Sequence, residues 1–161
     1  MILWRDGPRL RPGSSCAMIA AMELIPFATL TLGTGSEGFY MLGATPAGTR
    51  IIQEIHTAEL VGERVNASLL GSANADWLAI DAQGVGIFDI RLTLKTDDDA
   101  VLYLAYSGRA DWSEGLGRGP IFVGGEFEAG DERYRWLNAL HLFGRGGVAD
   151  GGVRYEFFQG V

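Results

Sequence analysis

Cysteine and histidine are scarce in this 161-residue chain, and their scarcity limits its chemistry. Cys16 is the only cysteine, so no disulfide can form within the chain and no cysteine-rich metal site can be built. The two histidines, His56 and His141, lie in separate predicted strands, and neither has a second metal ligand at the usual spacing. We therefore expect no metal centre and no disulfide framework.

Positive charge and long apolar runs are also in short supply. The chain has 13 Lys and Arg residues against 20 Asp and Glu residues, a formal charge of −7, whereas nucleic-acid binding requires a basic surface. No apolar run approaches the roughly 18 residues of a membrane-spanning helix. We therefore expect neither a nucleic-acid partner nor a membrane span. The length suits one domain with its own core.

Residues 1–21 differ from the rest of the chain, because Pro8, Pro12 and Gly13 interrupt any regular pattern. The short apolar piece that follows lacks the longer apolar core and the cleavage site of a secretory signal. Met18 and Met22 each offer an alternative start of the protein. We expect residues 1–21 to be a flexible N-terminal extension and residues 22–161 to form the folded domain. A cytoplasmic location follows by default.

The clearest structural signal lies in residues 76–111, which contain three predicted strands at residues 76–81, 85–95 and 101–108. In the middle strand apolar side chains alternate strictly with polar ones: Phe88, Ile90, Leu92 and Leu94 against Asp89, Arg91, Thr93 and Lys95. A period of two is typical of a half-buried antiparallel strand. We therefore expect the apolar set to face a core, and Asp89 and Arg91 to form a solvated pair outside it.

Further strands are predicted along the rest of the chain, with turn residues between them. They cover residues 24–32, 50–61, 64–70, 121–128, 134–143 and 152–159, and the segments 33–48 and 109–120 are predicted loops. No helical period is sustained. Short, evenly spaced strands with sequential connections favour an all-β fold, an antiparallel up-and-down barrel of about eight to nine strands. Closure of the barrel would remove exposed sheet edges.

One motif in the first predicted loop suggests a nucleotide site. Residues 33–38, Gly-Thr-Gly-Ser-Glu-Gly, match the G-x-G-x-x-G pattern of dinucleotide-binding proteins. That site needs a helix to begin there, so that its first amides face the pyrophosphate. Gly43, Pro46 and Gly48 follow and would interrupt such a helix. We therefore expect the glycines to form a loop, and we expect no cofactor.

Strand parity points to a candidate pocket inside the barrel. Alternate residues of each strand face the interior of a small barrel, which places Asp76 on the face of Leu78 and Tyr106 on the face of Leu104. Removal from water would raise the pKa of the Asp76 carboxyl toward the range useful for proton transfer. A mostly apolar interior with a few polar groups suits a small molecule.

The candidate site contains seven residues. The predicted catalytic residues are Asp76, Tyr106 and Asn138, and the predicted substrate-binding residues are His56, Phe88, Tyr134 and Trp136. Each also has a structural interpretation, since buried Tyr, Trp and Asn side chains are commonly core groups with satisfied hydrogen bonds. Asp76 is equally well placed to cap the turn at residues 73–75.

Five short segments also resemble a known family. Residues 27–32, 42–48, 76–78, 94–98 and 134–138 occur in the order and spacing of a bacterial and fungal family of unknown function, UPF0311 or DUF3237. The resemblance covers residues 23–161 and implies a calycin-like antiparallel barrel. It implies no settled activity, cofactor or catalytic residues. One departure is Asp97-Asp98-Asp99, where relatives tend to have a glycine in the turn.

Three functions are compatible with these observations. The first is a cofactor-independent isomerase, cyclase or hydratase that uses Asp76 as acid or base on a small, largely apolar organic molecule. The second is a non-catalytic carrier of such a molecule. The third is a structural or interaction protein, for which a homodimer is one expected form. A cavity that reaches Asp76 would favour the first two hypotheses over the third.

Overall fold

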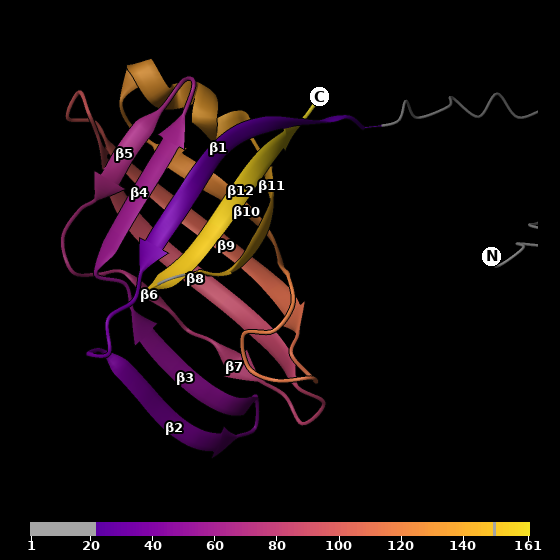
Figure 1. The fold of residues 1–161 in the computed structure, drawn as a ribbon. Coiled ribbons are helices and arrows are strands. Elements are labelled where there is room, and N and C mark those ends of the chain that lie inside the picture. The colour runs from indigo at the N-terminus through magenta and orange to yellow at the C-terminus, as the bar shows by residue number, and fades with distance from the viewer. Residues whose placement is uncertain (1–21, 150) are drawn as a thin grey trace, which may run out of the picture.

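The computed structural model describes residues 22–149 and 151–161 of the chain (Figure 1), so the expected N-terminal extension lies outside the described residues. The secondary structure is almost entirely β. The elements are β1 Leu24–Gly33, β2 Phe39–Thr45, β3 Gly48–Glu54, β4 Thr57–Gly62, β5 Asn66–Leu69, β6 Ala75–Asp76, β7 Ala79–Ile80, β8 Val85–Thr96, β9 Val101–Asp111, β10 Ile121–Ala129, the 3₁₀ helix η1 Glu132–Ala139, β11 Leu142–Ala149 and β12 Gly152–Gly160. In the described part of the chain, no helix is long and apolar enough to cross a membrane.

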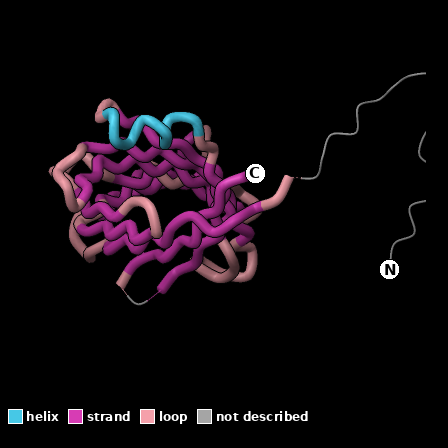
Figure 2. The backbone as a smooth tube through the Cα atoms, turned by 90° about the horizontal axis from the view of Figure 1, so that it is seen from above, coloured by secondary structure: helices cyan, strands magenta, loops and turns pink. Residues whose placement is uncertain are grey.

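Eight of the strands close into an antiparallel barrel, which confirms the predicted fold. Around the ring they follow the order β8-β5-β4-β1-β12-β11-β10-β9, and β9 pairs again with β8. The run from β8 to β12 is a simple meander, and β12 returns to pair with β1. Figure 2 shows the strands surrounding a common interior.

The remaining strands form a wall at one end of the barrel. Residues 86–91 of β8 pair with the short strands β6 and β7, whereas the last residues of β8 pair with β5. Strand β3 pairs with β6 and β7, and β2 pairs with β3 at the sheet edge. The wall therefore extends beyond the ring, opposite the end where η1 lies (Figure 1). This wall is where two insertions in the barrel come together, residues 34–56 between β1 and β4 and residues 70–84 between β5 and β8.

The alternation predicted for the middle strand is confirmed in β8. Phe88, Ile90, Leu92 and Leu94 are at most 3% exposed and face the barrel interior. On the outer face, Arg91 donates to Asp89 with 3.1 Å between Nη2 and Oδ2, and both side chains are about half exposed. An ion pair this exposed contributes little to stability.

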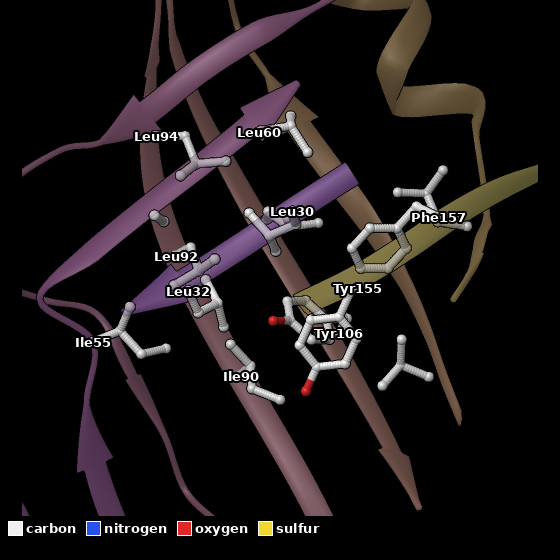
Figure 3. Close-up of a cluster of buried hydrophobic side chains, with 14 of the residues drawn as sticks. Leu30, Leu32, Ile55, Leu60, Ile90, Leu92, Leu94, Tyr106, Tyr155 and Phe157 are labelled. Carbon is white, nitrogen blue, oxygen red and sulfur yellow. The ribbon is translucent and has the colours of Figure 1, made fainter. Parts of the chain in front are cut away.

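The half of the interior near η1 is filled with side chains. Leucines from several strands pack there with no exposure above 1%, among them Leu30, Leu60, Leu92, Leu94, Leu102 and Leu104. Figure 3 shows part of this cluster with Phe157 beside it. Aliphatic groups packed at crystal-like density leave no room for a ligand, so any cavity must lie toward the other end of the barrel.

Four predictions about individual elements are wrong. Residues 76–81 are not one strand but belong to two short ones, β6 and β7. Residues 134–143 are not a strand, because η1 covers Glu132–Ala139 and starts at the cap residue Asp131. Residues 50–61 are two strands, since the chain leaves β3 at Glu54 and enters β4 at Thr57. The predicted loop 33–48 contains the edge strand β2, whose residues Phe39 to Leu42 are all exposed.

Candidate functional site

A cavity of about 470 Å³ lies between the wall and the barrel, in the half of the molecule that leucines do not fill. Apolar side chains line most of it, including Leu32, Ile51, Ile55, Leu78, Ile90 and Ile121. Its polar lining consists of Thr34, Gln53, Asp76 and Tyr155. A concave, mostly apolar space of this size with a few polar groups has the character of a small-molecule site.

The Asp76 carboxyl reaches the cavity from β6. The backbone of Asp76 pairs with Ile90 of β8 on one side and with Gln53 of β3 on the other. One carboxyl oxygen accepts the Asp89 backbone N–H at 3.2 Å. The preceding turn is held by Asn74, whose amide bonds Leu70 and Gly71 carbonyls and the Thr93 N–H. Asp76 is therefore not needed as a turn cap.

The surroundings of Asp76 shift its pKa to about 7 from an ordinary value of 3.8. Burial in the apolar cavity is the largest cause, because it penalises the charged carboxylate. The hydrogen bond from the Asp89 N–H opposes this shift, the negative charge of Asp89 adds to it, and the Arg50 guanidinium opposes it. Arg50 donates instead to the Trp77 carbonyl, so Asp76 titrates near neutrality with no direct ion pair.

Two tyrosines form the floor of the cavity. Tyr155 of β12 lines it directly, and Tyr106 of β9 lies behind, with their ring centroids 5.2 Å apart in an edge-to-face arrangement. In Figure 3 the two rings lie next to each other on the side of Ile90. Burial raises the pKa of both phenols, and the nearby Asp76 charge raises both further. Both tyrosines are therefore neutral hydrogen-bond donors at physiological pH.

Glycines on β11 make room for these rings. Gly146 is the register partner of Tyr155, and Gly144 is the partner of Phe157. A Cβ atom at Gly146 would overlap the Tyr155 ring, and one at Gly144 would press on Phe157. The aromatic rings cover the backbone that the glycines leave bare, which fixes the position of Tyr155 in the cavity floor.

Aromatic and aliphatic side chains complete the sides and the mouth. Phe88 of β8 and Trp112 from the β9–β10 loop meet edge to face at 5.1 Å and form one side. At the mouth, Phe39, Leu116 and Val148 are 45%, 66% and 59% exposed. The entrance is thus apolar and favours molecules with little charge.

The structure brings three of the seven predicted residues to this site. Asp76 and Phe88 line the cavity, and Tyr106 contacts Tyr155 behind its floor. The other four lie elsewhere. His56 is exposed and contacts the Glu37 carbonyl, with 3.1 Å between Nε2 and O.

The remaining three predicted residues belong to η1, at the opposite end of the barrel. The Asn138 amide bonds both the N–H and the C=O of Ala129, at 2.7 and 2.9 Å. The Tyr134 hydroxyl donates to Asp98 at 2.9 Å, and the Trp136 ring lies under the Arg64 guanidinium at 3.6 Å. These side chains were placed inward only because the segment was taken for a strand, and their polar groups secure η1 to the barrel.

Tyr155, Gln53 and Trp112 are among the cavity residues that the sequence-based prediction missed. Tyr155 was detectable, because Val153, Tyr155 and Phe157 alternate in a strand that was predicted. Gln53 was hidden by the assumption that residues 50–61 form one strand. Trp112 lies in a loop without any period, so no pattern predicts where its side chain points.

The described residues contain no group of three or more His, Cys, Asp and Glu side chains that could hold a metal ion. None of the residues that line the cavity is a lysine, an arginine or a histidine. A phosphate or carboxylate group would find no charged partner there. The arrangement can bind an apolar molecule, donate hydrogen bonds to it, and exchange a proton with it at Asp76.

Comparisons with known proteins identify a family and a shared fold. The sequence model of a family described as "Protein of unknown function (DUF3237)" matches residues 22–159. No curated protein sequence matches the chain significantly.

Several solved structures share the fold. A β-barrel-like protein from Acinetobacter baumannii has a TM-score of 0.79 and 24% identity, with 90% of this chain and 99% of that chain covered. A conserved protein of unknown function from Rhodopseudomonas palustris has a TM-score of 0.77 and 22% identity, with 89% and 100% covered. An enzyme from Penicillium herquei has a TM-score of 0.71 and 17% identity, with 90% and 98% covered. At these identities the likeness concerns the fold alone.

Proposed function

The chain belongs to the DUF3237 family of proteins of unknown function, and from this premise we propose that it is a cofactor-independent enzyme that works by acid–base chemistry. Its substrate would be a small, largely apolar organic molecule held in the cavity. The observation that carries the proposal is the Asp76 carboxyl, which lines an apolar cavity of about 470 Å³ and has a pKa of about 7.

A carboxyl with this pKa is suited to proton transfer at physiological pH. General acids and bases work best when their pKa lies near the operating pH, because both protonation states are then available. An ordinary exposed carboxylate is too weak a base for this role. Isomerisation, cyclisation and hydration or elimination need only a held substrate and a moving proton, so they fit a cavity with one titrating group.

The similarity to an enzyme from Penicillium herquei supports catalysis as a use of this barrel. It does not carry a reaction to this chain, because the identity is 17%. The reaction type must therefore be found from the chemistry of the cavity and by direct measurement.

The test compares the wild type with Asp76→Asn in mixtures of apolar metabolites monitored by mass spectrometry. We expect the wild type to convert at least one component and Asp76→Asn to convert none. The matched control is Asp97→Asn, because Asp97 is exposed in the turn between β8 and β9 and does not line the cavity. Equal conversion by wild type and Asp76→Asn would contradict the proposal. With Asp76 as base, conversion should rise with pH to a plateau, half-maximal near its pKa of about 7.

A ligand carrier is the second candidate, and the apolar mouth with Phe39, Leu116 and Val148 favours it. A carrier would hold its ligand through purification, so native mass spectrometry of the freshly purified protein should detect it. Asp76→Asn would then leave binding unchanged or tighter, since an uncharged amide costs less to bury than a carboxylate. A protein with a purely structural role would be expected to have a barrel interior filled by side chains. The cavity therefore counts against a purely structural role.

A further inference from the structure

The Tyr155 hydroxyl is one of the few polar groups in the lining of the cavity. Tyr155 is 1% exposed and lines the cavity. The Tyr106 hydroxyl behind it acts on the pKa of Tyr155, and within the described residues this Tyr106 oxygen is fully buried with no hydrogen-bond partner at ordinary distance. Buried polar groups are nearly always hydrogen-bonded. Two adjacent phenol hydroxyls at a cavity floor, one of them without a partner, leave a hydrogen-bonding position that a ligand atom can fill.

Asp76 and Tyr155 approach the cavity from different walls. Asp76 is on β6, which pairs with β8, and β8 and β12 are four steps apart in both directions around the eight-strand ring. The carboxyl accepts the Asp89 N–H, and no hydrogen bond within the described residues joins it to Tyr155. The two groups are nevertheless close enough for the charge of Asp76 to act on the phenol. The space between them is where a substrate would lie.

We propose that Tyr155 is a second catalytic residue. Its hydroxyl group donates a hydrogen bond to the carbonyl oxygen of a substrate, and the C–H bond next to that carbonyl group faces Asp76. The substrate class is then an uncharged apolar ketone or related carbonyl compound that reacts through its enolate. This inference rests on the proposed acid–base function and specifies it further.

The step is balanced with no other reactant. The Asp76 carboxylate takes a proton from the carbon next to the carbonyl group, and the C–H electron pair becomes the new C=C bond. The carbonyl π electrons move to the oxygen, where the hydrogen bond from Tyr155 stabilises the negative charge. The proton then returns from Asp76 to the same carbon or to another carbon of the conjugated system. Return to another carbon is an isomerisation.

The surroundings divide the roles between the two groups. Ionised Asp76 and ionised Tyr155 repel each other, so when Asp76 loses its proton the phenol keeps its own. A pair of groups whose pKa values are pushed apart is the usual arrangement of a base and a donor. Tyr106 does not line the cavity, so it is a positioning residue that supports the Tyr155 ring from behind.

A matched pair of probes tests the donor directly. 2-Acetylnaphthalene and 2-isopropenylnaphthalene have the same shape, but only the first has a carbonyl oxygen. We expect the wild type to bind the ketone about fivefold more tightly, the factor that one net hydrogen bond supplies. Tyr155→Phe should bind both probes equally, and the infrared carbonyl band of the bound ketone should move to higher wavenumber in that variant.

Deuterium exchange tests the proton transfer with the same ketone. In D₂O the wild type should exchange the methyl hydrogens of 2-acetylnaphthalene, as followed by proton NMR. Tyr155→Phe should slow this exchange about 100-fold, in line with the loss of one donor at a developing oxyanion. Asp76→Asn should abolish it and keep the binding preference for the ketone. Tyr103→Phe, on the outer face of β9, is the control and should behave as wild type.

The two proposals fail in different ways. A ketone preference that persists in Tyr155→Phe, or equal or absent binding of both probes by the wild type, would overturn the role of Tyr155. A ketone preference that depends on Tyr155, without any exchange, would keep the donor and refute acid–base catalysis by Asp76. Circular dichroism of each variant checks that it is folded. We expect the Phe variants to fold, because these substitutions remove only an oxygen atom.

Discussion

The rings of Tyr106 and Tyr155 meet edge to face inside the barrel, with centroids 5.2 Å apart and planes inclined by 73°. They come from β9 and β12, which are separated around the ring by β10 and β11. Edge-to-face contacts of this kind stabilise aromatic pairs beyond their buried area. The contact also separates the leucine-filled half of the interior from the cavity, so it is both part of the core and part of the site.

Removal of the Tyr106 hydroxyl should stabilise the protein. The oxygen is fully buried and has no hydrogen-bond partner within the described residues, and an unsatisfied buried group costs about 1–3 kcal/mol. We expect Tyr106→Phe to raise the free energy of unfolding in urea by about 1 kcal/mol. If the same variant also loses ketone binding, the hydroxyl helps to position Tyr155. A lower free energy of unfolding would show that the hydroxyl is satisfied in solution.

Asp76 should make stability depend on pH in the direction opposite to most carboxylates. Its pKa is about 7 in the folded protein and near 3.8 in the unfolded chain, so the folded state keeps a proton that the unfolded chain has released. Stability from this group is therefore present below about pH 4 and is lost as the pH rises through about 7.

The variant Asp76→Asn removes this dependence. At about pH 8 it should be more stable than the wild type, by up to about 4 kcal/mol, whereas near pH 4 the two should be similar. Urea unfolding at both pH values measures the difference, and Asp97→Asn, in the exposed turn between β8 and β9, is the control. If the difference in free energy of unfolding between the wild type and the variant is the same at both pH values, the Asp76 carboxyl is solvated in the folded protein. A gain at high pH would identify Asp76 as a destabilising group, which is typical of functional sites.

The barrel was predictable because period-two alternation survives in the strands that form it. Phe88 to Leu94 alternate strictly, and one buried face fixes which side chains point inward. Strand β11 escaped prediction because Gly144, Gly146 and Gly147 remove the apolar side chains that would reveal its period. Its packing is instead supplied by the rings of Tyr155 and Phe157 on the neighbouring strand. Because the side chains that fill the core beside β11 belong to β12, the sequence of β11 itself has no apolar alternation that would predict a strand.

The site was predictable only in part, for a related reason. Asp76 could be placed by parity, since it shares a face with the apolar Leu78. Gln53 and Trp112 reach the cavity from an insertion and a loop, whose positions depend on tertiary contacts that no local period encodes. Asn138 was misplaced because Tyr134, Trp136 and Asn138 repeat every two residues, although the segment is a 3₁₀ helix.

The corrected position of Asn138 predicts a structural role. Its amide satisfies both backbone groups of Ala129 at the end of β10, so Asn138→Ala leaves a partly buried N–H and C=O unpaired. We expect the free energy of unfolding to fall by about 1–3 kcal/mol, with ketone binding and deuterium exchange at the wild-type level. Loss of exchange in a variant that remains folded would return Asn138 to the catalytic site.

The turn between β8 and β9 contains three consecutive aspartates, residues 97–99. Asp99 has a φ of 70°, a left-handed conformation that glycine adopts freely, aspartate tolerates and β-branched residues resist. Its carboxylate also accepts Lys95 Nζ at 2.9 Å, in an exposed pair that contributes little. Asp99→Gly relieves backbone strain in the folded protein, but glycine also gives the unfolded chain more freedom. Because these effects oppose each other, we expect the free energy of unfolding to change by no more than about 0.5 kcal/mol.

Asp99→Val should lower the free energy of unfolding by about 1–2 kcal/mol, whereas Asp97→Val, at an exposed position without a positive φ, should lower it much less. Thermal unfolding of the three variants measures this order, and equal losses in the two valine variants would show that the turn does not hold Asp99 in the left-handed region.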